Sequence, residues 1–178
     1  MRFTSDQRGV LRGMVAAIVA TITSLIIAVQ ADILPHPISN NLSDRLSFGA
    51  AWSLAIVLWL VLCIGVLARH RFLNAEDING SGLTKGSPRA IILQAVLQNT
   101  LEQVTLAGFV YGSCAVLLPF LWLPVIPAGA ILFSLGRALF FTGYSSGAAA
   151  RALGFGLTFY PTIVLFGLCI VSVIFDFS

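Results

Sequence analysis

The chain has 178 residues, of which 58% are hydrophobic and only 10% are charged; its net charge is +3 and its mean hydropathy is +0.96. A soluble domain carries about 25% charged residues, so this composition excludes a water-soluble globule. It also excludes disordered chains, coiled coils and nucleic-acid binders, because each of these needs abundant charge. The length allows one domain over residues 1–178.

Apolar runs predict five transmembrane helices, because about 20 apolar residues in a helix cross the hydrocarbon core and a spanning segment must satisfy its own backbone groups. In chain order the runs are Met14–Leu34, Phe48–Ala68, Ala90–Leu118, Pro127–Tyr144 and Ala152–Phe175. We therefore expect an all-α integral membrane protein. It consists of a four-helix transmembrane bundle over residues 48–175, preceded by one N-terminal transmembrane helix over residues 1–34.

The first run has an alternative interpretation as a secretory signal peptide. Basic residues precede it, and it ends in Val29-Gln30-Ala31, with a small residue where cleavage would occur. Its length exceeds the usual apolar core of about 7–15 residues, which favours a retained helix. The second helix starts on the outer side in either case, so the topology of the remaining helices is unchanged.

The basic residues orient the predicted helices. With alternating spans, the N-terminus, the loop 69–89 and the loop 144–151 share one side, and that side holds all of the ten Lys and Arg residues except Arg45. Cytoplasmic loops carry an excess of Lys and Arg. The sequence therefore predicts that the N-terminus and both loops are cytoplasmic and that the C-terminus lies outside.

The third segment carries a polar arc that could hold a ligand. Gln94, Gln98, Asn99, Glu102 and Gln103 cover about half of the helix circumference at about 100° per residue. An ionised carboxylate facing lipid costs several kcal/mol, so the arc must face a bundle interior, a subunit interface or a wet cavity. Two interpretations stay open, a hydrogen-bond network that joins helices and a polar ligand pocket.

A second cluster lies around the end of the fourth segment. Arg137 and Tyr144 are seven residues apart and share a helix face, and Arg151 follows after seven more. The arginines could be anchors that reach the headgroups. If the bundle instead brings them to Glu102, they would bind a zwitterionic or anionic ligand, since the guanidinium fork suits carboxylates. An arginine beside a thiol would also stabilise the reactive thiolate.

Other chemistry has little support in the sequence. There is no phosphate-binding loop, nucleophile elbow or paired-cysteine metal site. Cys63, Cys114 and Cys169 lie in apolar runs, which favours packing over a disulfide framework. His36 and His70 are expected on opposite sides of the membrane, with His70 as a solvated loop residue. The sequence therefore predicts no metal site.

Three stretches resemble the MAPEG family, the membrane-associated proteins in eicosanoid and glutathione metabolism. They are Leu97-Gln98-Asn99-Thr100-Leu101-Glu102-Gln103, the pair Gly143-Tyr144 with Arg137 and Arg151 seven residues to either side of Tyr144, and Ala68–Phe72 with Asn74–Asp77. Together they cover roughly residues 48–175, so Met14–Leu34 would be an added N-terminal helix.

The resemblance implies a homotrimer in the lipid bilayer, with active sites between neighbouring protomers that hold glutathione and admit a small lipophilic substrate. By this likeness the residues expected to bind substrate are Gln98, Asn99, Glu102, Arg137 and Tyr144, with Arg69 or Arg71 for the second substrate and Asp77 as the partner of an arginine. Arg151 matches the arginine that stabilises the glutathione thiolate. Ala95 and Phe140 depart from the family pattern, which often has an arginine and an aromatic hydroxyl at these places.

The sequence thus leads to a first hypothesis, a membrane-embedded, glutathione-dependent enzyme of transferase or peroxidase type that acts on lipophilic substrates. The alternative is a non-enzymatic, MAPEG-like membrane scaffold or lipid-binding protein, in which Asn99 and Glu102 join subunits. A third hypothesis, a small transporter or proton relay using Glu102, lacks the paired broken helices typical of that class.

Overall fold

The computed structural model describes residues 3–31, 35–37, 39–80, 83 and 85–175, and all regular structure in these ranges is helical. The long helices are α1 (Ser5–Gln30), α2 (Leu42–Leu73), α3 (Pro88–Leu117), α4 (Val125–Gly143) and α5 (Ala148–Phe175), with short 3₁₀ turns η1 (Phe120–Trp122) and η2 (Tyr144–Ser146). Five helical segments are long and apolar enough to cross a bilayer. The protein is therefore an integral, multi-pass membrane protein, and the predicted fold class is confirmed.

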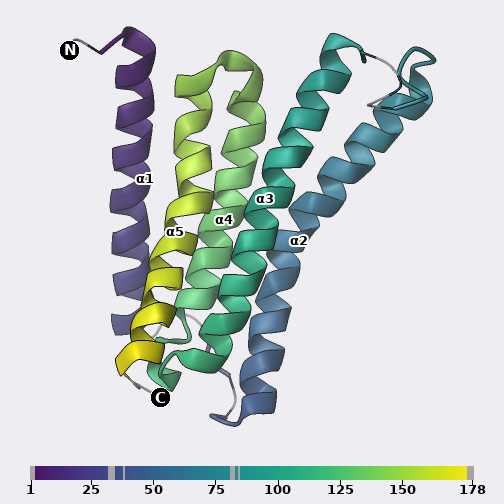
Figure 1. The fold of residues 1–178 in the computed structure, drawn as a ribbon. Helices are drawn as coiled ribbons and strands as arrows, with labels where there is room; N and C mark the ends of the chain where they lie inside the picture. Colours follow the sequence, from purple (N-terminus) through teal and green to yellow (C-terminus); the bar gives the residue numbers. More distant parts are fainter. Residues whose placement is uncertain (1–2, 32–34, 38, 81–82, 84, 176–178) are drawn as a thin grey trace.

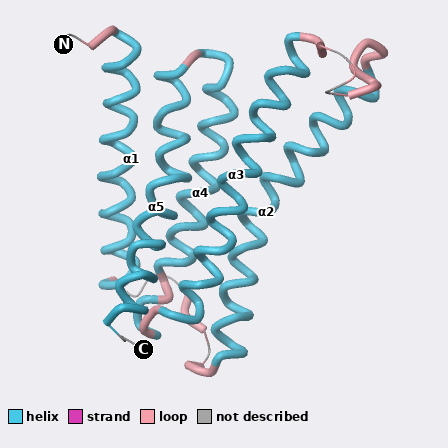
Figure 2. Tube along the Cα trace, in the orientation of Figure 1, coloured by secondary structure: helices cyan, strands magenta, loops and turns pink. Residues whose placement is uncertain are grey.

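The helices run side by side, with α4 and α5 as a close hairpin between α1 on one side and the α2–α3 hairpin on the other (Figure 1). The start of α1, the α2–α3 connection and the α4–α5 connection all lie at the same end, shown at the top in Figure 2. We call this the basic end, because the segments that carry most of the Lys and Arg residues lie there. The α2–α3 hairpin leans away from α4 and α5 as it approaches this end.

All five helices begin before the predicted apolar runs, and α2 also continues past its run to Leu73. Thr4 starts α1 with a capping box, in which the Gln7 backbone N–H donates to the Thr4 hydroxyl and the Thr4 backbone N–H donates to the Gln7 side chain. Asn41 caps α2 by accepting from the Asp44 backbone N–H at 2.8 Å. Hydropathy marks only the part of a helix inside hydrocarbon, whereas polar caps extend it into the interface. The predicted final residues of the first helix, 32–34, lie outside the described residues.

Small residues attach α1 to the rest of the bundle. Gly9, Gly13 and Ala17, spaced by four, face the first turns of α5. A Cβ atom built on Gly13 would lie 2.9 Å from the Leu153 backbone nitrogen, and one built on Gly156 would lie 2.5 Å from the Ala17 Cβ. Such close approach of two backbones is the usual basis of helix association in a bilayer, where no hydrophobic force drives it.

Arg45, the one basic residue predicted on the opposite side, also has a structural explanation. Its Nε donates to the Ala115 carbonyl at 2.8 Å, and its Nη2 donates to the Val116 carbonyl at 3.2 Å and to the Leu118 carbonyl. These carbonyls lie at the C-terminal end of α3, where the helix dipole favours a cation. Arg45 therefore joins α2 to the end of α3.

We predict that Gly13→Leu detaches α1 from α5, because the new side chain would overlap the α5 backbone. The expected loss is about 1–3 kcal/mol in the free energy of unfolding, as for other overpacked sites. The control is Gly65→Leu, since a Cβ on Gly65 meets no atom within 4 Å. Denaturant unfolding in detergent micelles checks this, and equal stability of the two variants would contradict the packing described.

Candidate functional site

A cavity of about 420 Å³ opens between α1, α3, α4 and α5 near the basic end. It is lined by Val10, Met14, Asn99, Phe140, Tyr144, Ala148, Arg151, Ala152, Phe155 and Tyr160. Three of the predicted site residues, Asn99, Tyr144 and Arg151, thus come together from three different elements. Tyr160 lies in the apolar run of α5, and its presence in the lining could not be predicted from the motifs.

Arg137 lies directly beside this cavity and is completely buried, with 0% of its surface exposed. Its Nη1 donates to the Asn99 side-chain oxygen at 3.0 Å, and its guanidinium lies 4.2 Å from the centroid of the Phe140 ring. Its Nε and Nη2 atoms have no hydrogen-bond partner among the described residues. A buried donor without an acceptor costs about 1–3 kcal/mol, and more when it is charged. The arrangement therefore favours an acceptor, above all an anion, at this place.

Arg151 packs on an aromatic pair formed by Phe140 and Tyr144, on the ring that Arg137 does not contact. Gly147 adopts φ +101°, a conformation that glycine tolerates best, where the chain leaves η2 to start α5. Arg151 then falls in the first turns of α5, and its guanidinium lies 4.6 Å from the centroid of the Tyr144 ring. Phe140 and Tyr144 contact each other edge to face at 5.3 Å. Each arginine therefore packs on one ring of this pair.

The structure places Gln98 and Glu102 on the outward face of α3 instead of in the cavity. Both are exposed, and Gln98 Nε2 donates to Glu102 Oε1 at 2.9 Å. Arg69 is likewise exposed, near the end of α2. Within one protomer it is Asn99, one helical turn before Glu102, that meets the buried arginine.

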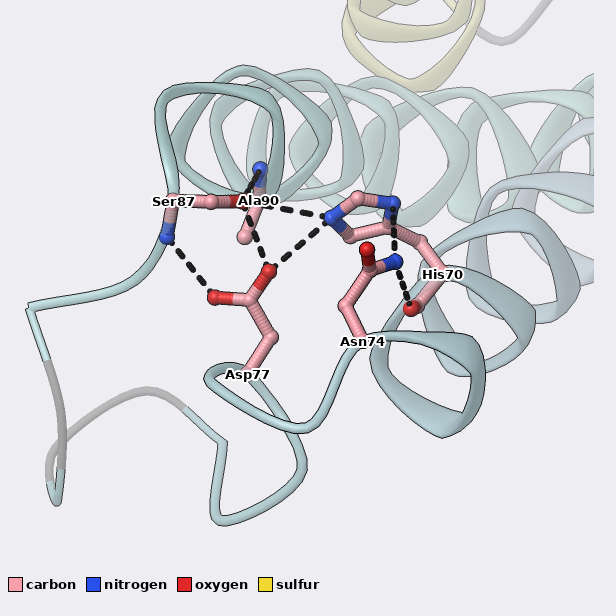
Figure 3. Close-up of polar contacts among 5 residues, drawn as sticks. All are labelled: His70, Asn74, Asp77, Ser87 and Ala90. Carbon is pink, nitrogen blue, oxygen red and sulfur yellow. Dashed lines mark hydrogen bonds and ion pairs between the residues drawn. The ribbon is translucent and has the colours of Figure 1, made fainter.

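Asp77 closes the connection between α2 and α3, as Figure 3 shows. Its Oδ1 accepts from the Ser87 backbone N–H at 2.7 Å, and its Oδ2 accepts from the Ser87 hydroxyl at 2.6 Å and lies 3.0 Å from His70 Nε2. Asn74 Nδ2 lies 3.2 Å from His70 Nδ1 and also donates to the His70 carbonyl at 2.6 Å. Ser87 in turn accepts from the Ala90 backbone N–H and caps α3.

One expectation is corrected by this cluster. His70 was predicted to be a solvated loop residue, but α2 continues past the apolar run to Leu73, which puts His70 in its last turn against Asp77. The expected pairing of Asp77 with an arginine stays a prediction; within the protomer its two oxygens contact Ser87 and His70. The Nη2 atom of Arg71 donates to the Gln94 side-chain oxygen at 2.9 Å.

The α1–α3–α4–α5 cavity has polar groups that could hold an organic cofactor. Among the described ranges, no group of three or more His, Cys, Asp or Glu side chains converges in a way that could hold a metal ion. The groups that face or flank the cavity are two guanidiniums, one amide and two phenols, of Arg137, Arg151, Asn99, Tyr144 and Tyr160. The chemistry of this set suits an organic anion, because guanidinium, amide and phenol groups can all donate hydrogen bonds.

The family model for the MAPEG family matches residues 49–171, which is more than half of the chain. The chain belongs to the MAPEG family. The match covers most of α2, all of α3 and α4, and all but the last residues of α5. The α1 helix lies outside the match and is an addition to the family's part of this MAPEG protein. Comparison with curated proteins and with solved structures gives no match. Membership supports a membrane function related to glutathione-dependent transferases and peroxidases.

In this MAPEG protein the added helix takes part in the site. Val10 and Met14, one turn apart on α1, line the cavity opposite Asn99. The small-residue contacts of Gly9 and Gly13 with α5 lie on the neighbouring turns. Because α1 supplies one wall, its attachment to α5 also decides the shape of the cavity.

We predict that Asp77 makes stability depend on acid pH. Hydrogen bonds from the Ser87 side chain and backbone, followed by His70, lower the pKa of Asp77 below its ordinary value. A lowered pKa means that this contribution to stability is complete above the unfolded-state pKa of about 3.9 and is lost as the pH falls below it. Asp77→Asn should reduce the melting temperature at neutral pH and flatten its decline between about pH 5 and pH 3.

The matched control is Glu76→Gln, which removes a carboxylate from the exposed neighbouring residue. Melting temperatures of both variants and of the wild type in detergent, measured across this pH range, test the assignment. If Asp77→Asn and Glu76→Gln change the pH profile equally, Asp77 has no special part in it.

Proposed function

We propose that the protein is a membrane-embedded, glutathione-dependent enzyme of transferase or peroxidase type. It would combine the cytosolic thiol with a lipophilic substrate that enters from the bilayer. The observation that carries this proposal is the charge imbalance of one cavity. The guanidiniums of Arg137 and Arg151 flank it, the Nε and Nη2 atoms of Arg137 lack partners among the described residues, and no carboxylate occurs among the described residues that line it.

The electrostatics of the cavity suit a thiolate. Arg151 lies near the N-terminus of the long helix α5, where the helix dipole already disfavours a cation and favours an anion. A nearby guanidinium and a helix N-terminus both lower the pKa of a thiol, and the thiolate is the nucleophile. Arg151 would therefore stabilise the sulfur anion of glutathione before it attacks.

The other residues that line the cavity form a polar part, suited to glutathione, and an apolar part, suited to the lipophilic substrate. Asn99 fixes Arg137 through its amide oxygen, and Tyr144 and Tyr160 bring phenol groups to the lining that can bond the peptide part of glutathione. Val10, Met14 and Phe155 offer apolar surface for the second substrate. A volume of about 420 Å³ lies in the usual range of small-molecule sites.

The outward face of α3 supports the proposed homotrimer. Gln98, Glu102 and Thr105 are exposed on a helix that crosses the membrane, although a carboxylate facing lipid costs about 2.5–3.5 kcal/mol on insertion scales. Gly108 and Gly112 continue this face, and Cβ atoms built on them meet nothing within 4 Å. A neighbouring protomer that packs there would cover the polar groups and could bring Glu102 to its own cavity.

The second candidate, a non-enzymatic scaffold or lipid-binding protein, is favoured by Phe140. Its ring fills the side of the cavity beneath Arg137, at the place where the family resemblance leads one to expect a hydroxyl. In that case Gln98 and Glu102 would only join subunits. Glutathione binding separates the two functions.

We predict that Arg151→Ala removes the thiolate of bound glutathione while leaving most of the binding. The thiolate absorbance in ultraviolet difference spectra should disappear at neutral pH, and turnover with a lipophilic electrophile should fall by about 10²–10³, as for other lost electrostatic stabilisers. Arg12→Ala is the control, because Arg12 is exposed on α1 near the basic end. If millimolar glutathione gives the wild type neither heat in calorimetry nor a shift in melting temperature, the enzyme proposal is refuted.

We predict that Gly112→Leu dissociates the trimer, since a large side chain would prevent the close approach of α3 to a neighbour. Native mass spectrometry in detergent should show monomers for this variant. Trimers should persist in the control Gly167→Leu, whose Cβ would also meet no atom within 4 Å but lies on α5. A monomeric wild type would contradict the proposed assembly.

We predict that Glu102→Gln weakens glutathione binding by about one to two decades if the subunit interface forms the site, through the loss of a charge-assisted bond. Calorimetric titration of the trimeric protein checks this. A variant that changes only the stability of the trimer, with unchanged glutathione affinity, would support the scaffold function.

A further inference from the structure

A second polar cavity, of about 310 Å³, lies within the α2–α3 hairpin at the basic end, apart from the site proposed above. Its polar lining comes from Arg71 at the end of α2, Lys85 in the connection, and Gln94 and Gln98 on α3. We propose that this cavity binds the headgroup phosphate of an anionic phospholipid. The proposal concerns a pair of cations other than Arg137 and Arg151.

The guanidinium of Arg71 is held in place by the local structure. Gln94 accepts from Arg71 Nη2 at 2.9 Å. Gly80, at φ +78°, lets the connection pass so close that a Cβ atom there would lie 3.7 Å from Arg71 Nη1. A guanidinium and an ammonium group held beside one cavity are the groups that bind phosphate.

The one carboxylate in the lining is already engaged. Asp77 has Oδ1 bonded to the Ser87 backbone N–H and Oδ2 bonded to the Ser87 hydroxyl and near His70, as Figure 3 shows. Its side chain is only 1% exposed. Both oxygens of Asp77 are therefore used in fixing the connection to α3.

Apolar side chains around the cavity indicate that the hairpin end lies in the membrane interface. The exposed large hydrophobic residues here are Phe72 (79%), Leu73 (62%), Ile78 (60%) and Leu83 (81%). The hairpin leans away from α4 and α5 at this end, so lipid can surround it (Figure 1). Basic pockets next to a transmembrane helix on the cytoplasmic side are where anionic headgroups bind, and a soluble anion would need no such apolar surroundings.

The proposal is tested by native mass spectrometry of the purified protein in non-ionic detergent, titrated with phosphatidylglycerol or phosphatidylcholine. The wild type should retain phosphatidylglycerol in preference to phosphatidylcholine. The double variant Arg71→Gln/Lys85→Gln should lose about 25-fold in phosphatidylglycerol affinity, about fivefold for each cation removed, with no change for phosphatidylcholine. Lys85→Gln alone should lose about fivefold in phosphatidylglycerol affinity. Because Lys85 is exposed in the connection, this single variant tests the site even if the double variant does not fold.

The matched control is Arg69→Gln/Arg89→Gln, which removes the same charge from two exposed residues on the same helices, outside this cavity. It should retain phosphatidylglycerol. Equal losses in both double variants, or a wild type that does not distinguish the two lipids, would overturn the site. Inorganic phosphate distinguishes the source of the anion. If it binds alone as tightly as phosphatidylglycerol and displaces it at equal concentration, the site is one for free phosphate and the lipid proposal is wrong.

Discussion

The buried guanidinium of Arg137 is the constraint on which the chemistry of the cavity depends. A charge at this depth is tolerated only with partners, since an unpaired buried ion costs several kcal/mol. The protein supplies one hydrogen bond, from Arg137 to Asn99, and the face of the Phe140 ring. Its other N–H groups have no acceptor among the described residues. A bound anion is the partner that would complete this environment, and the adjoining cavity gives it room.

Close helix packing turns that single charge into a site with two cations. Gly136 and Gly154 let the backbones of α4 and α5 approach, such that a Cβ on Gly154 would lie 2.4 Å from the Phe140 nitrogen. Gly147 then returns the chain into α5 and places Arg151 on Tyr144, next to the ring that carries Arg137. The α1 helix closes the opposite wall. The cavity therefore depends on glycines far more than on the polar residues that give it chemistry.

The helices and part of the cavity were predictable, because hydropathy and motif spacing can be read from short stretches of sequence. Five apolar runs gave the five helices, and the resemblance to MAPEG proteins brought Asn99, Tyr144 and Arg151 to one cavity. The pairing of Arg137 with Asn99 instead of Glu102 depends on how α3 is rotated against α4, which no local pattern specifies. His70 joined a helix because polar residues extended α2 beyond its apolar run. The Gly9–Gly13–Ala17 spacing was visible in the sequence, but such spacings are common by chance; Gly108 and Gly112 show the same spacing and meet only open space in the protomer.

In the function we propose, Arg137 binds an anion and does not hold the fold together. Melting of the wild type and of Arg137→Met, with and without millimolar glutathione, tests it most directly. An apolar side chain of similar length in place of a buried charge is usually neutral or stabilising. We therefore expect the ligand-free variant to melt at the wild-type temperature or above it, and only the wild type to gain stability from glutathione. A variant that melts far below the wild type yet still gains the same stability from glutathione would contradict the account.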